Sequence, residues 1–149
     1  MRKGFSMLTA IIFLILVATI ATLTLTLSSQ SLKQTNDIFL RSQAELLAKS
    51  ATEYALLAIS GHDINATNNC VNSINTQYPQ AGNNAIFDIN ITLHYIGNGL
   101  PNGCNALSNS LSTNDSNLTV IIDTIIATTT ENNISSEPIR LHRRTIQKP

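Results

Sequence analysis

The chain has 149 residues, with nine Lys or Arg and nine Asp or Glu, so its formal net charge is zero. This length suits one modest domain beside an anchor, and the balanced charge identifies no class of partner. The charges are unevenly distributed, because no Lys or Arg occurs between Lys49 and Arg140 and the last ten residues are basic.

The first predicted element is an uncharged apolar run from Leu8 to Leu27, without Gly or Pro. A helix of this length spans about 30 Å, the thickness of a bilayer core, and a lone segment pairs its backbone in lipid only as a helix. Arg2 and Lys3 precede the run, which favours a cytoplasmic N-terminus and an exported remainder. A cleaved secretory signal is the alternative, but its apolar core is typically about 7–15 residues long and precedes an Ala-x-Ala site.

The helical pattern continues beyond the apolar run. Charged and amide residues occupy most faces between Ser28 and Ser60, and Gly61 is a natural helix end. The sequence therefore predicts one uninterrupted helix from Phe5 to Ser60, about 84 Å long. We expect its second half to pack on the following domain through the segment from Leu46 to Leu57. The recurring apolar residues of this half are Leu32, Phe39, Leu46, Leu47, Tyr54, Leu57 and Ala58.

The segment from Lys3 to Leu8 resembles the leader of type IV prepilins and pseudopilins, with a short basic peptide, Gly4, Phe5 and an apolar helix. This resemblance extends over the whole chain through the long helix and the β region after it. It implies that a membrane aspartyl prepilin peptidase cuts between Gly4 and Phe5 and that Phe5 is then methylated. The implied parts are a leader (1–4), a transmembrane half-helix (5–27), an amphipathic half-helix (28–60) and a periplasmic β domain (61–149).

Two positions depart from the family pattern. The fifth mature residue is usually a Glu, whose carboxylate neutralises the N-terminal amine of a neighbouring subunit within the apolar filament core, and here it is Thr9. Burying an unpaired charge costs several kcal/mol, so Thr9 favours a minor subunit at the tip or start of a filament over the bulk subunit. Thr26 stands where many pilins carry a helix-kinking Pro.

Beyond the helix, the sequence predicts a small sheet. The segment 62–84 is rich in Asn, Thr and Gly, which indicates a loop. Ala85–Ile96 alternates apolar and polar residues and predicts a half-buried strand, and Asn117–Thr128 and Pro138–Gln147 predict two more. The expected fold is therefore α+β, with a long N-terminal helix on a small antiparallel sheet, as the resemblance to pilins also implies.

The only two cysteines of the chain are Cys70 and Cys104. In an exported domain such a pair favours a disulfide, which would stabilise the folded state by about 3–4 kcal/mol in the chain-entropy model. Two free thiols in a cytoplasmic domain are the alternative.

No catalytic or metal-binding pattern accompanies the three histidines, so the sequence indicates no enzyme activity, cofactor or metal. The basic tail has two interpretations. It could attract DNA, as some minor pilins do, or it could pair with Asp123 or Asp88 on neighbouring strands. The lack of interleaved aromatic residues favours local pairing. The tail comprises Arg140, His142, Arg143, Arg144 and Lys148.

Asparagine forms a further pattern. Five Asn-x-Ser/Thr sequons occur, and four carry an acid two residues before the Asn, although only nine of the 149 residues are acidic. This arrangement resembles the acceptor sequence of bacterial periplasmic oligosaccharyltransferases and indicates N-glycosylation. An Asn-rich composition with acids placed for turns explains it equally well. The acidic sequons lie at Asn65, Asn90, Asn117 and Asn133, and the fifth lies at Asn114.

Two hypotheses of different class remain. The first is a minor pilin or pseudopilin of a type IV pilus, a type II secretion system or a competence machine. Phe5, Thr9 and the apolar face up to Leu27 would then contact other pilin subunits, and the expected partners include an inner-membrane assembly platform and the prepilin peptidase. The second is a monomeric single-pass membrane protein with a periplasmic ligand-binding domain, which has no use for processing at Gly4.

Overall fold

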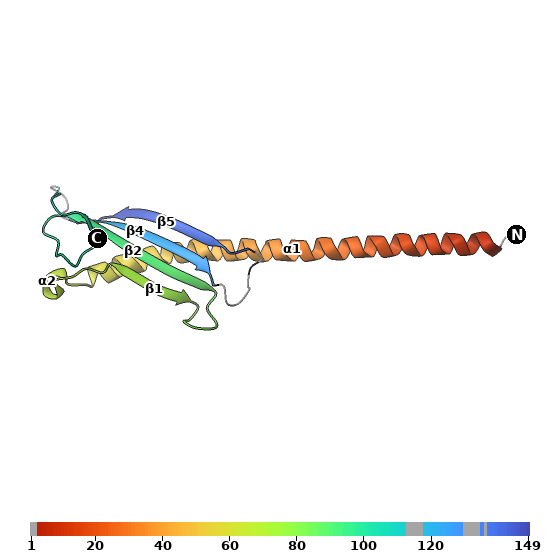
Figure 1. Cartoon of the computed structure of the whole chain (residues 1–149), viewed down its shortest axis with the longest axis horizontal. Coiled ribbons are helices and arrows are strands. Elements are labelled where there is room, and N and C mark those ends of the chain that lie inside the picture. The colour runs from red at the N-terminus through yellow and green to blue at the C-terminus, as the bar shows by residue number, and fades with distance from the viewer. Residues whose placement is uncertain (1–2, 113–117, 130–134, 136) are drawn as a thin grey trace. The chain divides into compact units, whose positions relative to one another are not determined.

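The computed structural model describes residues 3–112, 118–129, 135 and 137–149. It contains one long helix, one short helix and five strands, in the order shown in Figure 1. The elements are α1 (Lys3–Ser60), α2 (Ile64–Thr67), β1 (Ser73–Tyr78), β2 (Phe87–Gly97), β3 (Ala106–Ser108), β4 (Leu118–Thr128) and β5 (Arg140–Gln147).

Helix α1 is continuous and ends at Ser60, as predicted from Gly61. Contacts within the chain divide it into two compact units, Met1–Ile38 and Phe39–Pro149. This boundary lies inside the expected amphipathic half-helix, because the part of α1 from Leu40 onward contributes side chains to the core of the second unit.

The strands of the second unit form one sheet with the order β1-β2-β4-β5, and neighbours along this path are antiparallel (Figure 1). The short strand β3 pairs with β2 in parallel. The three predicted strands correspond to β2, β4 and β5. The prediction of a loop over 62–84 was wrong in part, because that segment contains α2 and the edge strand β1. The connection after β2 also contains the short strand β3, which was not predicted.

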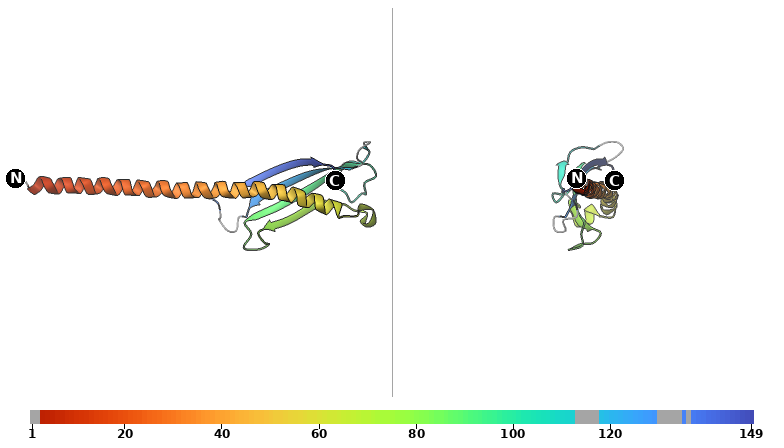
Figure 2. Two further views of the ribbon diagram at one scale, coloured as in Figure 1. Left: turned by 180° about the vertical axis from the view of Figure 1, so that it is seen from behind. Right: turned by 90° about the vertical axis from the view of Figure 1, so that its right-hand side faces the viewer.

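The core of the second unit lies between one face of the sheet and α1. The predicted inward face of β2 is confirmed, since Phe87, Leu93 and Tyr95 are each at most 1% exposed. Val120, Ile122 and Ile126 of β4 are fully buried beside them. The alternate residues of β2 face outward, as their positions in a pleated strand require. Figure 2 shows the second half of α1 lying along one face of the sheet.

The predicted segment, Leu46 to Leu57, does pack on the sheet, but through a different face from that of its large apolar residues. Phe39, Leu46, Tyr54 and Leu57 are all more than half exposed. The buried face is instead lined mostly by alanines, because small side chains let a helix approach a sheet filled with Phe, Tyr, Ile and Leu. The buried residues of α1 are Leu40, Ala44, Ala48, Ala51, Thr52, Ala55 and Ile59.

Candidate assembly surface

The described residues of the first unit, 3–38, are all helical, and their apolar side chains from Met7 onward are exposed. The described residues contain one helical segment, Met7–Ser60, that is long and apolar enough to cross a membrane by length and composition, and none of its most apolar window is buried. Exposed side chains there include Ile11, Phe13, Leu14 and Leu25, each at least 60% accessible. Such a surface is stable in lipid or against other apolar helices.

The hydroxyls of this unit are compatible with an apolar surrounding. Thr22 donates to the Thr19 carbonyl at 2.9 Å, and Thr24 and Thr26 donate to carbonyls three residues earlier at 2.8 Å. These bonds satisfy each hydroxyl within the helix, so the Thr-rich segment can lie in lipid without an unpaired donor.

The expected processing site lies at the start of α1. Gly4 and Phe5 belong to this helix, which begins at Lys3, and the side chains before Met7 lie outside the described residues. Cleavage between Gly4 and Phe5 would therefore require the first helical turn to open, and terminal turns fray readily. Thr9 is exposed on the same helix.

A second apolar face lies on the part of α1 that belongs to the second unit. Phe39 is 59% exposed, Leu46 is 63% exposed and Leu57 is 69% exposed. These positions are seven and eleven residues apart, so at about 3.6 residues per turn they share one side of the helix. That side is opposite to the alanines that contact the sheet. We call Phe39, Leu46 and Leu57 the outer stripe.

A disulfide joins the segment after α2 to the loop between β2 and β3. Cys70 and Cys104 are bonded as predicted, with Cα atoms 4.8 Å apart. Asn72 connects the two loops as well, because its Nδ2 donates to the Gly103 carbonyl at 2.7 Å and its Oδ1 accepts from the Asn105 amide at 2.8 Å. The Tyr95 hydroxyl donates to the Val71 carbonyl, and burial raises the pKa of Tyr95 to about 12.

Replacing Gly103 with alanine should destabilise the second unit by about 1–2 kcal/mol. An added Cβ would lie 2.6 Å from Oδ1 of Asn69, the same atom that accepts the Cys70 amide at 2.8 Å. Denaturant unfolding with the disulfide intact measures the loss. The double variant Asn69→Ala/Gly103→Ala should be more stable than the sum of the two single effects predicts, and strict additivity would contradict a clash at this contact.

The acids before two sequons have local structural roles. Asp63 Oδ1 accepts the Ala66 amide at 3.1 Å at the start of α2, and Asp88 Oδ1 accepts from Gln77 Nε2 at 2.7 Å across β1 and β2. Asn90 is exposed in the middle of β2, which is paired on both sides. These contacts support the turn-and-strand explanation of the acids. The side chain of Asn65 is not among those described, and Asn117 and Asn133 lie outside the described residues.

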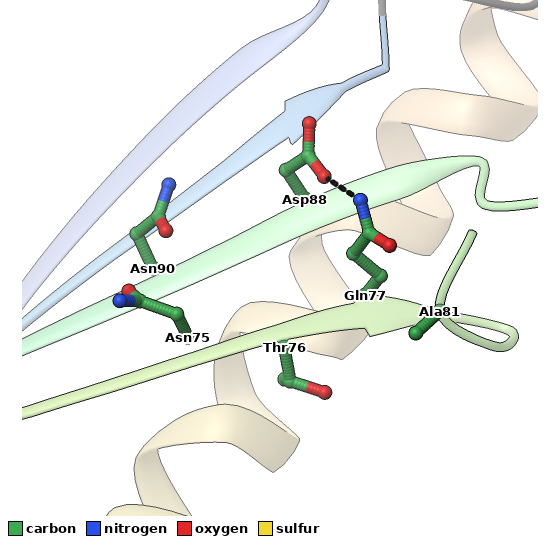
Figure 3. Close-up of a pocket in the computed structure, with 6 residues that line it drawn as sticks. All are labelled: Asn75, Thr76, Gln77, Ala81, Asp88 and Asn90. Atoms are coloured by element: carbon green, nitrogen blue, oxygen red, sulfur yellow. Dashed lines mark hydrogen bonds between the residues drawn. The ribbon is translucent and has the colours of Figure 1, made fainter. Parts of the chain in front are cut away.

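Asp88 and Asn90 also line a polar hollow on the outer face of the sheet (Figure 3). The Gln77 amide is fixed from both ends, since its Oε1 accepts the Gly82 amide at 2.8 Å while its Nε2 binds Asp88. The hollow is open and carries one charged group. Its lining residues are Asn75, Thr76, Gln77, Ala81, Asp88 and Asn90.

The basic tail is partly neutralised by one acid, as the local interpretation predicted. Asp123 of β4 accepts from Arg144 Nε at 2.7 Å and from Arg144 Nη2 at 2.9 Å, and it lies 2.9 Å from His142 Nε2. The Arg144 hydrogen bonds are the main reason that the pKa of the Asp123 carboxyl lies below its ordinary value of 3.8. The expected pairing with Asp88 does not occur, because Asp88 binds Gln77.

Removing this carboxylate should reduce the acid sensitivity of the domain. A carboxyl whose folded pKa is lowered stabilises the fold at pH values above its unfolded pKa, and that contribution is lost as the pH falls below 3.8 and through the folded value. Asp123→Asn should therefore lower stability at neutral pH and flatten the decline below about pH 4. Thermal unfolding between pH 7 and pH 2 measures both effects. If stability declines below about pH 4 as steeply in Asp123→Asn as in the unsubstituted protein, this role for Asp123 is contradicted.

In comparisons with known proteins, no protein-family model, curated protein or solved structure matches this chain significantly.

Proposed function

We propose that this chain is a minor pilin or pseudopilin, a structural subunit of a type IV pilus, a type II secretion pseudopilus or a competence pseudopilus. The observation that carries the proposal is the outer stripe. The helix already buries one face on its own sheet, yet Phe39, Leu46 and Leu57 present a second apolar face to the surroundings. In a monomeric domain this apolar face would stay exposed to water, which is unfavourable, whereas a bundle of parallel helices would bury it.

The N-terminal sequence supports the same proposal. The apolar unit follows the short basic segment ending in Gly4 and Phe5, which matches a prepilin leader. In this proposal the protein is held in the inner membrane with its disulfide-bonded domain in the periplasm, and it then enters a filament through an inner-membrane assembly platform. The role is structural rather than enzymatic, and the partners are other pilin-type subunits.

Thr9 supports a minor position in the assembly. A threonine hydroxyl cannot neutralise a neighbouring ammonium group, and an uncompensated charge in an apolar bundle costs several kcal/mol. A subunit without the carboxylate is tolerated at the tip, where it has no neighbour above it. Quantitative proteomics of sheared filaments should find the chain scarce relative to a subunit with Glu at this position, and a finding that it is the main component would contradict the tip assignment.

A single-pass membrane protein with a periplasmic ligand-binding domain is the second candidate. The polar hollow of Figure 3, with the fixed Gln77 amide and the Asp88 carboxylate, favours it. This candidate does not explain the exposed outer stripe or the leader-like segment.

The mass of the protein extracted from its native membrane discriminates between the two candidates. Processing predicts a chain that begins at a methylated Phe5, and Gly4→Val should leave the precursor uncut. A chain that retains Met1, or one cut beyond Ser28, would contradict the pilin proposal.

A further inference from the structure

The edge strand β5 combines an open backbone edge with a high density of positive charge. It pairs with β4 on one side, and in the described part of the chain no strand pairs with its other side (Figure 1). Four of its eight residues are basic or histidine, and it contains no proline. Edge strands with Lys or Arg repel similar edges, which limits indiscriminate pairing.

Only two of the four basic or histidine side chains of β5 contact an acid within the described residues. Asp123 binds His142 and Arg144, but the described residues provide no ion pair for Arg140 or Arg143. The register aligns Arg143 with Thr124, which is buried toward the helix, so Arg143 extends from the helix-facing side of the sheet. Arg144 and Arg140 extend from the opposite side.

A groove between β5 and α1 brings a further cation to this edge. It has a volume of about 240 Å³, and Lys49 of α1 lines it opposite Arg143. Lys49 also has no ion-pair partner among the residues that the structure describes. The complete lining is Glu45, Ala48, Lys49, Leu141, His142 and Arg143.

We propose that β5 binds an extended acidic peptide segment of a partner protein by strand addition. The open edge supplies main-chain N–H and C=O groups that only another extended polypeptide matches. Acidic side chains on one face of the added strand would reach Arg143 and Lys49 in the groove, and acidic side chains on its other face would reach Arg140. Because the edge repels basic strands, its charge selects among partners as well as attracting them.

Nucleic acid fits this surface less well. Neither β5 nor the groove carries a Phe, Tyr or Trp side chain on which a base could stack. The groove also contains the carboxylate of Glu45, which repels phosphate. Asp123 already pairs with two of the side chains, His142 and Arg144, that would bind a sugar-phosphate backbone. This inference does not depend on filament assembly, because a monomeric membrane protein would present the same edge.

Binding of defined peptides to the full chain in nanodiscs tests the proposal. An octapeptide of alternating Glu and Val, which places all its Glu side chains on one face when extended, should bind. The same peptide N-methylated at every residue should lose most of its affinity, because neither of its edges can then donate hydrogen bonds to β5. Equal binding of the two peptides would show simple charge attraction and overturn strand addition. Tighter binding of a single-stranded oligonucleotide than of the Glu-Val peptide would overturn the choice of a peptide partner.

Charge reversals locate the site. Arg143→Glu and Lys49→Glu should each weaken binding of the Glu-Val peptide about tenfold, since they reverse a charge at the groove. Lys148→Glu, beyond the end of β5, is the matched control and should change the affinity little. If Arg143→Glu does not fold, Lys49→Glu on the exposed side of α1 still decides the result. An equal loss in Lys148→Glu and Lys49→Glu would contradict a site in the groove.

Discussion

Replacing Phe39 and Leu46 together with glutamate is expected to abolish incorporation of the chain into filaments while leaving its domain folded. Both side chains are more than half exposed, so the substitutions remove no core contact, and exposed substitutions typically change stability by about 0.5 kcal/mol or less. In an assembled bundle the same glutamates would be buried without partners, at a cost of several kcal/mol each. Filament recovery, together with thermal unfolding of the purified variant, measures both outcomes.

The matched control places the same two charges elsewhere on the helix. Gln30→Glu with Gln34→Glu alters exposed positions on the side of the helix away from the outer stripe and should preserve assembly. Normal incorporation of the Phe39→Glu/Leu46→Glu variant would show that the outer stripe is not an assembly contact. Loss of folding in that variant would contradict the assignment of helix faces.

On the face of α1 that packs on the sheet, a charged substitution should instead destabilise the folded domain. Ala48 is 1% exposed beneath the sheet, so Ala48→Asp would bury a carboxylate without a partner and overfill a close helix–sheet contact. We expect a loss of about 4 kcal/mol or more, enough to unfold a domain of this size. Denaturant unfolding of the disulfide-bonded protein measures it.

Leu46→Asp, two residues away, is the control for this substitution. It introduces the same group at a position that is 63% exposed and should leave unfolding nearly unchanged. A small loss of stability in Ala48→Asp, or a large one in Leu46→Asp, would contradict the assignment of the buried and exposed faces of the helix.

The sequence predicted the elements that carry a strong period. The alternation over Phe87 to Tyr95 predicted both the strand β2 and its buried face, and Gly61 predicted the end of α1. Strand β1 was missed because its sequence, Ser73 to Tyr78, is polar and covers only an edge. A polar edge strand gains its stability from pairing with β2, which no local pattern reveals.

The face of α1 that packs on the sheet could not be predicted from hydrophobicity alone. Large apolar residues such as Phe39 and Leu46 give the stronger signal, but the sheet face is already filled by side chains such as Phe87 and Tyr95. It therefore leaves room mostly for small side chains of the helix. The spacing of Ala44, Ala48, Ala51 and Ala55 was the available signal. Two apolar faces on one helix indicate one internal contact and one external contact.

The local roles of the charged residues depended equally on tertiary contacts. Asp123 was predicted as a partner of the basic tail because it lies on a neighbouring strand, and the register places it beside Arg144. The role of Asp88 could not be foreseen, since its partner Gln77 belongs to the strand that the sequence analysis missed. The groove between β5 and α1 likewise requires the packing of two distant segments.

Site-specific photo-cross-linking in the native membrane tests the central claim most directly. A photoreactive residue at Leu46 reports what covers the outer stripe, and one at the exposed Glu45, on the adjoining side of the helix, reports a position outside the stripe. The account predicts that position 46 forms adducts with the N-terminal helices of other pilin-type subunits, and that position 45 forms far fewer. Adducts of equal yield at both positions, or none at position 46 in cells that assemble filaments, would contradict it.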